Sequence, residues 1–201
     1  MIPLLHALAW ALLAILVHGD REYSKLFIKG PAFSLYPDPT FTVVSPELGR
    51  SGAWMSSNYT ADGSGRFPGL EWKSPSPYVK EYLLVSEDPD APLSHPIVHG
   101  LYYGIPRVFT GLGDEDFQYG TEPYTVSGGF KYGVCRGGGV YLPPSPMAGH
   151  GPHRYFFEVI ALNERIDTGK LKSPVTLDKI SHAIEGKVIG WGMWIGLVER
   201  K

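Results

Sequence analysis

The sequence predicts a mainly β protein that folds as a single domain. Its 201 residues are enough for one domain with a substantial hydrophobic core. Glycine occurs 25 times and proline 18 times, which indicates many turns and loops. Between these turns stand short runs rich in β-branched and aromatic residues, a composition typical of strands. Hydrophobic residues make up 43% of the chain and charged residues 19%, as in an ordinary globular protein.

An apolar run from Leu4 to Val17 opens the chain and allows three interpretations. The run is shorter than the roughly 20 residues that a bilayer span requires, so a membrane helix is disfavoured. A secretory signal peptide needs a basic residue before the apolar run, and none precedes it, although Gly19 is small enough for a cleavage site. We prefer a helix within residues 1–20 that lies on the domain or on a partner surface and stops at Gly19.

Residues 21–40 are predicted to form an extended connector. They include the prolines at positions 31, 37 and 39, which favour extended backbone in the residues before them. The rest of the chain, residues 41–201, is assigned to one domain. Its first short strand is expected from Phe41 to Val44, and a turn region follows Phe67 to Trp72.

The rim of a pocket is predicted where two strands meet in the middle of the chain. The strand Glu81 to Glu87 must give way near Asp88, because the proline that follows cannot donate a ladder hydrogen bond. Asp88 and Asp90 therefore stand at the end of this strand. The next strand, Ile97 to Tyr103, is β-branched and aromatic and carries His99.

A second stretch with candidate functional residues is the loop Tyr141 to Tyr155, YLPPSPMAGHGPHRY. Its prolines and glycines forbid regular structure. The loop leads directly into the apolar strand Phe156 to Leu162 and brings His153, Arg154 and Tyr155 to its start. A rigid loop of this kind holds polar side chains in place, so little entropy is lost when a ligand binds.

Three further elements complete the prediction. A short strand is expected around Lys131 to Cys135, between two glycine-rich turns. Thr176 to Glu185 is predicted to be a helix because its apolar residues recur with helical spacing and a glycine follows it. The final strand, Val188 to Glu199, is rich in tryptophan and is interrupted by glycines, which indicate a bend or a close backbone approach.

The residue types at the predicted rim favour a small acidic ligand. His99 and His153 offer ring N–H donors, and a neighbouring carboxylate would keep each ring protonated near neutral pH. We expect Asp90 to orient His99 and to favour its imidazolium form, which donates charge-assisted hydrogen bonds to a phosphate or carboxylate. The plainer alternative is that Asp88 and Asp90 are turn residues and that a strand histidine packs in the core. The joint pattern favours the binding site.

Charge and histidine spacing disfavour nucleic acid and metal as partners. With 18 basic and 20 acidic residues the net charge is −2, and no basic cluster is present to attract a phosphate backbone. The histidine pairs 95/99 and 150/153 are poorly spaced for a metal. Four strand residues span about 13 Å, whereas zinc lies about 2 Å from each imidazole. We expect no metal and no cofactor.

Cys135 is the only cysteine, so an intrachain disulfide is impossible and the chain suits a reducing compartment. We therefore expect a cytoplasmic protein, or a secreted one if residues 1–19 are a signal peptide. The sequence has no nucleophile-elbow pattern, and Cys135 lies beside Arg136 in a glycine-rich stretch without further signs of reactivity. Whether the protein is an enzyme, and its oligomeric state, are left open by the sequence.

Two motifs, DPDAP followed by a strand histidine and the loop that ends in GHGPHRY, resemble those of the phosphatidylethanolamine-binding proteins. The resemblance covers about Phe41 to Glu199, and the segments HGLYYGIP, GHGPHRYFFE and EGKVIGWGMW look like the fungal branch. It implies a β-sandwich core with peripheral α-helices around one small anion-binding pocket. The positions that match the family's pocket are Asp88, Asp90, His99, Tyr141, Pro144, His153 and Tyr155.

The chain departs from the family pattern around this pocket. Gly100 stands where an aromatic residue usually follows the strand histidine, and Gly104 replaces the asparagine of the usual NIP. In the loop, Pro143 stands in place of a glycine and Met147 in place of a proline. The mouth of the pocket is therefore expected to differ from that of a typical family member.

Two classes of function follow from the resemblance. The first is a protein of a fungal secondary-metabolite pathway that acts on organic acids or anhydrides, since some proteins of the fungal branch are implicated in coupling maleic anhydride monomers. His99, Asp90 or His153 would then serve as acid or base. The second is a regulatory module that binds a phospholipid headgroup or another small anion without catalysis. The altered mouth favours the first. The expected partner is a small carboxylate, anhydride or phosphate, and a membrane surface is a weaker candidate.

Overall fold

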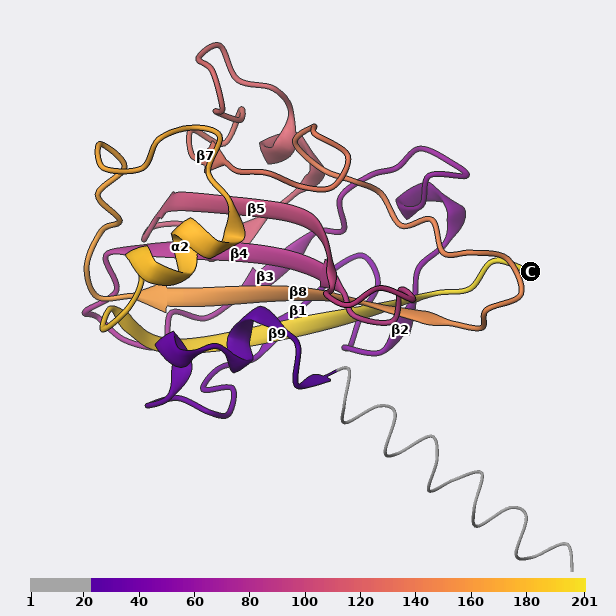
Figure 1. The fold of residues 1–201 in the computed structure, drawn as a ribbon, viewed down its shortest axis with the longest axis horizontal. Coiled ribbons are helices and arrows are strands. Elements are labelled where there is room, and N and C mark those ends of the chain that lie inside the picture. The colour runs from indigo at the N-terminus through magenta and orange to yellow at the C-terminus, as the bar shows by residue number, and fades with distance from the viewer. Residues whose placement is uncertain (1–22) are drawn as a thin grey trace, which may run out of the picture.

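The computed structural model describes residues 23–201, which form two β-sheets with short helices at the periphery (Figure 1). In chain order the elements, with η for a 3-10 helix, are η1 (Phe27–Lys29), η2 (Pro31–Phe33), β1 (Val43–Val44), β2 (Ala53–Trp54), η3 (Ser57–Tyr59), β3 (Leu70–Trp72), β4 (Glu81–Asp88), β5 (Ile97–Pro106), β6 (Gly111–Leu112), η4 (Asp114–Phe117), β7 (Lys131–Tyr132), β8 (His153–Leu162), α2 (Leu177–Ala183) and β9 (Val188–Val198). The predicted mainly β, single-domain fold is confirmed.

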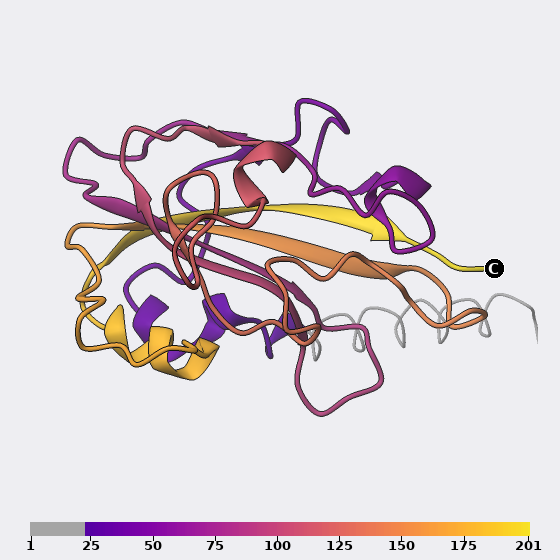
Figure 2. The same cartoon turned by 90° about the horizontal axis from the view of Figure 1, so that it is seen from above.

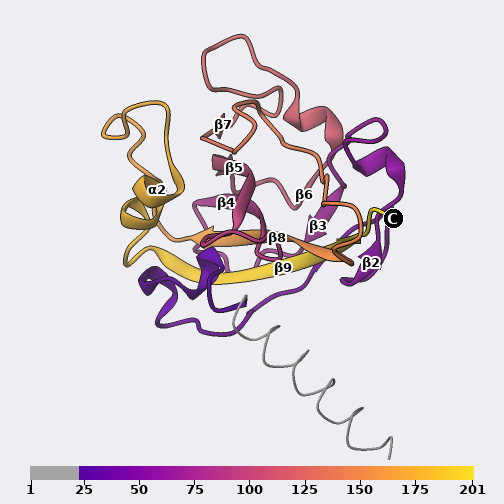
Figure 3. The ribbon, with the colours of Figure 1, turned by 45° about the vertical axis from the view of Figure 1, so that its right-hand side comes forward.

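The larger sheet has six strands in the order β2-β9-β8-β4-β5-β7, and the smaller has three in the order β1-β3-β6. Figure 3 shows this order of strands in the large sheet from β7 down to β9, with β3 and β6 on one side and α2 on the other. The long strands β4, β5, β8 and β9 pair antiparallel, whereas β2 pairs parallel with β9. Strands β4 and β8 are buried along almost their whole length because they are central and covered on both faces.

The predicted long strands are all present, and the short ones are shorter than expected. Only Val43 and Val44 of the first predicted strand pair with a neighbour, and only Lys131 and Tyr132 of the segment before Cys135 do so. The predicted helix is present as α2. Its Thr176 is the N-cap, and the hydroxyl accepts a hydrogen bond from the backbone N–H of Lys179.

The two faces of the large sheet bury separate hydrophobic cores. The face toward the small sheet packs around Phe67, whose ring stacks on Phe117 and meets Tyr102 edge-on. The opposite face buries Trp191 and Ile160 beneath α2 and the segment that carries η1 and η2. Figure 2 shows this layering, with the indigo 3-10 helices and the gold α2 together on one side of the large sheet.

The segment before β1 differs from the extended connector that its prolines predicted. Residues 26–36 contain two 3-10 turns instead, and Leu26, Ile28 and Phe33 are buried against the large sheet. The reason is the apolar content of the segment, which covers a face of the sheet that would otherwise be open to water. The expected helix or signal segment at residues 1–20 lies outside the described residues. Within residues 23–201, no helix is long and apolar enough to cross a membrane.

Two glutamates are buried together beneath this segment. Glu87 of β4 and Glu158 of β8 project from the same face of the sheet and are 1% and 0% exposed. Glu87 accepts a hydrogen bond from the backbone N–H of Phe27. The carboxyl group of Glu158 interacts with that of Glu87 and with the backbone N–H of Ile28, although neither contact has ordinary hydrogen-bond geometry. Burial raises the pKa of Glu158 well above its usual range and the pKa of Glu87 to about 7.

Glycines on β9 allow other segments to pass directly over this strand, as their positions in the sequence predicted. A Cβ atom on Gly192 would lie 2.3 Å from the backbone oxygen of Phe41. One on Gly196 would lie 2.2 Å from the Sδ atom of Met55. The chain before β1 and the chain after β2 can therefore cross β9 only because these positions lack a side chain.

We expect the substitution Gly192→Ala to destabilise the protein by about 1–3 kcal/mol, because the obstructing atom belongs to the backbone and cannot turn away. Urea unfolding followed by tryptophan fluorescence measures this. Gly69→Ala is the matched control, since the nearest atom to its added Cβ would be 3.8 Å away. Equal losses of stability in the two variants would contradict the close approach at Gly192.

Candidate functional site

A pocket of about 290 Å³ lies at one end of the large sheet. Antiparallel pairing brings the end of β4, the start of β5 and the start of β8 together at this end of the sheet. The loop before β5 and the proline-rich loop before β8 complete its walls. The pocket is lined by Asp88, Ala91, Pro92, Leu93, Ile97, His99, Arg136, Leu142, Pro143, Ser145, Pro146, Met147, His153 and Tyr155.

The polar floor of the pocket is an ion pair between Asp88 and His153. The ring Nδ1 of His153 lies 2.9 Å from Asp88 Oδ2, and both side chains are almost completely buried. This hydrogen bond and the charge of Asp88 outweigh burial and raise the pKa of His153, so the imidazolium form is favoured. With Nδ1 held by the carboxylate, the Nε2–H donor is left for a ligand.

Asp88 also fixes the turn that follows β4. Its Oδ1 accepts a hydrogen bond of 2.8 Å from the backbone N–H of Asp90, while its Oδ2 binds His153. Both carboxylate oxygens are therefore used within the protein. This is the local reason for the sequence Asp-Pro-Asp, since a proline between the two aspartates fixes the backbone of a tight turn.

The expected pairing of Asp90 with His99 is wrong. The carboxylate of Asp90 binds Arg154 instead, with 2.8 Å from Nε to Oδ2 and 2.6 Å from Nη2 to Oδ1. It also accepts a hydrogen bond from the backbone N–H of Arg154. Asp90 does not line the pocket. The two aspartates of the turn thus anchor two successive residues of β8. The planar guanidinium prefers this two-point contact to a single bond with an imidazole.

His99 is in the pocket, but as a neutral ring rather than the expected imidazolium. Its Nδ1 lies 2.7 Å from the backbone oxygen of Leu142 and must donate its proton there. Burial is the main cause that lowers the pKa of His99, and the positive charges of His153 and Arg136 add to it against the opposing effects of Leu142 and Asp88. The other nitrogen, Nε2, is buried and has no hydrogen-bond partner among residues 23–201. It offers a lone pair to the pocket.

The remaining predicted site residues separate into one that lines the pocket and two that support it. Tyr155 lies in the wall, and its ring meets His99 edge-on at 5.0 Å between centroids. Burial raises the pKa of Tyr155, so its hydroxyl stays protonated. Tyr141 packs edge-on against Phe67 and is not part of the wall. Pro144 is buried, and its carbonyl accepts a hydrogen bond from the backbone of residue 61.

Several wall residues were not predicted from the sequence. Arg136 is exposed at the mouth, and its backbone N–H donates to the carbonyl of Val98 on β5. Its place in a glycine-rich stretch gave no signal, because the pairing that brings it to β5 is long-range. Leu93 and Met147 come from two different loops that face each other only in the folded chain. In the sequence, Met147 stands out as a departure from the family pattern and not as a pocket residue.

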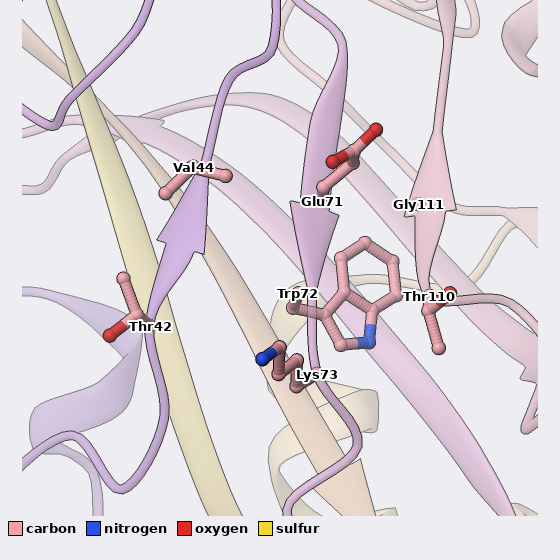
Figure 4. A pocket seen from close by; sticks show the side chains of 7 residues that line it. All are labelled: Thr42, Val44, Glu71, Trp72, Lys73, Thr110 and Gly111. Atoms are coloured by element: carbon pink, nitrogen blue, oxygen red, sulfur yellow. The ribbon is translucent and has the colours of Figure 1, made fainter.

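A larger hollow of about 700 Å³ lies on the small sheet, between Val44, Glu71, Lys73 and Thr110 (Figure 4). Most of its lining side chains are exposed, and the buried Trp72 contributes an indole Nε1 without a hydrogen-bond partner among the described residues. Its two charged side chains have opposite signs and both face water. Size alone therefore does not make it the candidate site, because no buried ionisable groups converge there as they do beside His99.

The structure gives no support for a reactive cysteine or for a metal site among residues 23–201. Cys135 is buried, and its thiol lies 3.2 Å from the carbonyl oxygen of Gly139. Within residues 23–201, no three histidine, cysteine, aspartate or glutamate side chains are grouped in a way that could hold a metal ion. The pocket of His99 and His153 thus stays the candidate site, because three buried ionisable side chains, Asp88, His99 and His153, line it together.

Comparison with known proteins adds relatives that span nearly the whole chain. "Phomoidride biosynthesis cluster protein B" of Talaromyces stipitatus is 45% identical over 203 residues, which cover 98% of this chain and 83% of the relative. A protein of the same name from another fungus is 41% identical over 183 residues, with 89% and 88% covered. A solved E. coli structure described as a member of the mammalian PEBP family has a TM-score of 0.67 at 23% identity, covering 81% of this chain and 99% of that one.

The match to the family itself extends over most of the described structure. A sequence profile entitled "Phosphatidylethanolamine-binding protein" matches residues 47–199, which include both sheets except β1 and all the ionisable residues of the pocket. A putative family member from Chlamydia trachomatis shares the fold, with a TM-score of 0.66 at 23% identity over 82% of this chain and 100% of that one. This chain therefore belongs to the phosphatidylethanolamine-binding protein family.

Proposed function

We propose that the protein binds a small organic acid, or its cyclic anhydride, in the pocket between His99 and His153, and that it assists the coupling of such molecules in a fungal secondary-metabolite pathway. One observation carries this proposal. The buried ring of His153, hydrogen-bonded to Asp88, lies in the same pocket as His99, whose buried Nε2 has no hydrogen-bond partner among residues 23–201. The pKa of His153 is raised and that of His99 is lowered. The pocket thus combines a cationic donor with a base.

The cationic donor accounts for the choice of an acid. A carboxylate or an anhydride oxygen beside His153 would accept its Nε2–H, and the low polarity of the surroundings strengthens such a bond. Arg136 at the mouth adds a second positive charge. The cavity of about 290 Å³ is at the small end of the range for ligand sites, roughly 300–1,000 Å³. This size suits a small acid better than a phospholipid with two acyl chains.

The neutral base accounts for a coupling reaction. The Nε2 lone pair of His99 would take a proton from the carbon next to the acid or anhydride group, while His153 stabilises the charge that develops on oxygen. The resulting carbanion adds to the carbon–carbon double bond of a second, unsaturated molecule such as a maleic anhydride. The π bond breaks, its electron pair becomes a carbanion on the adduct, and this carbanion takes back the proton from His99. The step consumes no oxidant, reductant or water. The relatives named after phomoidride biosynthesis support a substrate of this class.

Binding and turnover of the small acid test this proposal. We expect calorimetric titration with succinate to show a single site, and His153→Ala to weaken it by roughly 10- to 100-fold, because one charge-assisted hydrogen bond contributes about 1.5–3 kcal/mol. Formation of the coupled product from alkyl maleic anhydrides should fall by about 10² to 10⁴ in His99→Gln, the effect of losing one general base.

The exposed His95 provides a matched control, since it lies in the loop just before the strand that carries His99 but does not line the pocket. His95→Gln should behave as the parent protein in both assays. Binding of succinate without any product formation above buffer would leave the second function, an anion-binding module without catalysis. A preference for glycerophosphoethanolamine over succinate would also favour that module. Unchanged succinate affinity in His153→Ala would refute the proposed site.

A further inference from the structure

The pocket has two chemically different halves. The polar half consists of the side chains of Asp88, His99, His153 and Tyr155, which are all buried. The other half is apolar and is formed by two loops and the first residue of β5. Its side chains are Ala91, Pro92, Leu93, Ile97, Leu142, Pro143, Pro146 and Met147. A ligand that occupies the whole pocket must therefore present an acidic end and an apolar body.

The apolar half continues outward to the mouth. Leu93 of the loop before β5 is 43% exposed, and Met147 of the proline-rich loop is 55% exposed. Deeper in the pocket, Pro146 is buried and Ile97 is half-buried. The apolar surface thus runs from the histidines to solvent between two loops. Methionine is unbranched and flexible, so Met147 can adapt to chains of different shape.

We propose, as a refinement that rests on the proposed function, that the ligand is an organic acid carrying an alkyl chain that lies between Leu93 and Met147. The acid group binds His153, and the chain covers the apolar wall on its way to the mouth. Removing this wall from water supplies affinity that the acid group alone does not provide. Arg136 lies on the polar side of the mouth. Its positive charge would attract the carboxylate of a second acid group on the ligand.

A chain-length series tests this refinement. Succinate and its ethyl-, butyl- and hexyl-substituted forms have the same acid groups and differ only in the chain. We expect the dissociation constant measured by calorimetry to fall by about two- to fourfold per methylene until the chain reaches solvent, where fourfold corresponds to complete burial. Leu93→Ser and Met147→Ser should each reduce this slope. Leu35→Ser is the matched control, because Leu35 is 83% exposed and lies outside the pocket.

The outcomes separate this refinement from the proposed function. If succinate binds and the longer acids bind no more tightly, the alkyl site is refuted and the acid site stands. If no member of the series binds, both fail. A slope that is unchanged in Leu93→Ser and Met147→Ser places the chain elsewhere and also refutes the proposal. If hexylsuccinate binds His153→Ala as tightly as it binds the parent protein, its binding is nonspecific adsorption. This result would also refute the proposal.

Discussion

Asp88→Asn is expected to weaken binding of small anions at neutral pH by at least about tenfold. Complete loss of one charge-assisted hydrogen bond would weaken it about 100-fold. Both oxygens of Asp88 accept hydrogen bonds, from the backbone N–H of Asp90 and from the ring of His153. The amide of Asn has only one accepting oxygen. Its NH₂ group would therefore face one of these two N–H donors, and that hydrogen bond would be lost. The negative charge that raises the pKa of His153 is lost as well.

The pH dependence of this effect follows from the direction of the shift. Because the pKa of His153 is raised, the imidazolium that binds the anion is present at low pH and is lost as pH rises through the raised value. In Asp88→Asn the pKa falls, so affinity should decline at lower pH than in the parent. Sulfate is a suitable probe, since its charge is constant over the neutral range. NMR titration of the His153 ring measures the same change directly.

Asp90→Asn is the matched control for this experiment. It removes the same charge two residues away, but its partner is Arg154, which does not line the pocket. We expect it to lower stability, because the two-point contact with the guanidinium is broken. The pH profile of sulfate binding should shift less than in Asp88→Asn, because Asp90 makes the smallest of the contributions that raise the pKa of His153. If Asp90→Asn shifts that profile and Asp88→Asn does not, the assignment of the two aspartates is reversed.

Glu158→Gln is expected to stabilise the protein at alkaline pH, and the gain should grow as pH rises above 4.5. In the parent, burial raises the pKa of Glu87 from 4.5 to about 7, and that of Glu158 is raised as well. The folded protein therefore holds protons that the unfolded chain releases above pH 4.5. Stability must fall as pH rises from 4.5 toward 7 and beyond, because the unfolded state binds fewer protons. Gln keeps the shape and removes one of the two acids.

Urea unfolding at several pH values measures this difference. Near pH 4.5 both carboxyl groups are protonated in the folded protein, so the variant and the parent should be closely similar. The charges that face the pair from the covering segment are Lys29, which opposes the rise in the pKa of Glu158, and Tyr23, whose own pKa is raised. Glu71→Gln, at an exposed position of β3, serves as control. A gain that is independent of pH would mean that Gln acts through packing alone.

The polar site shows where sequence patterns reach their limit. The proline after Asp88 and the strand composition predict Asp88 and His99 at the rim of a pocket, and the resemblance to the family adds His153 and Tyr155. All four line one pocket in the structure. Sequence patterns cannot decide which carboxylate meets which base. Asp88 and Asp90 are two residues apart, and so their side chains reach different neighbours once β8 lies alongside β4. The preference of Asp90 for Arg154 depends on a guanidinium that this pairing delivers.

The protonation of His99 also depends on the folded surroundings. Nearby carboxylates in the sequence suggested an imidazolium, whereas burial and a backbone carbonyl at 2.7 Å make the neutral ring the favoured form. Burial depends on every element around the site and is not encoded in the local motif. The same holds for Glu87 and Glu158, because the sequence does not reveal that they share one face of the sheet beneath residues 26–28.

Local sequence patterns are enough to predict the mainly β class, the long strands and the helix before β9, because periodicity, proline and glycine act locally. The polar residues of the pocket follow from these patterns together with the family motifs. The partners of the two aspartates, the opposite pKa shifts of the two histidines and the apolar wall between Leu93 and Met147 become visible in the folded chain. These properties arise from contacts between residues far apart in the chain. Their energies depend on burial and on distances between side chains, which are defined once the two sheets have packed.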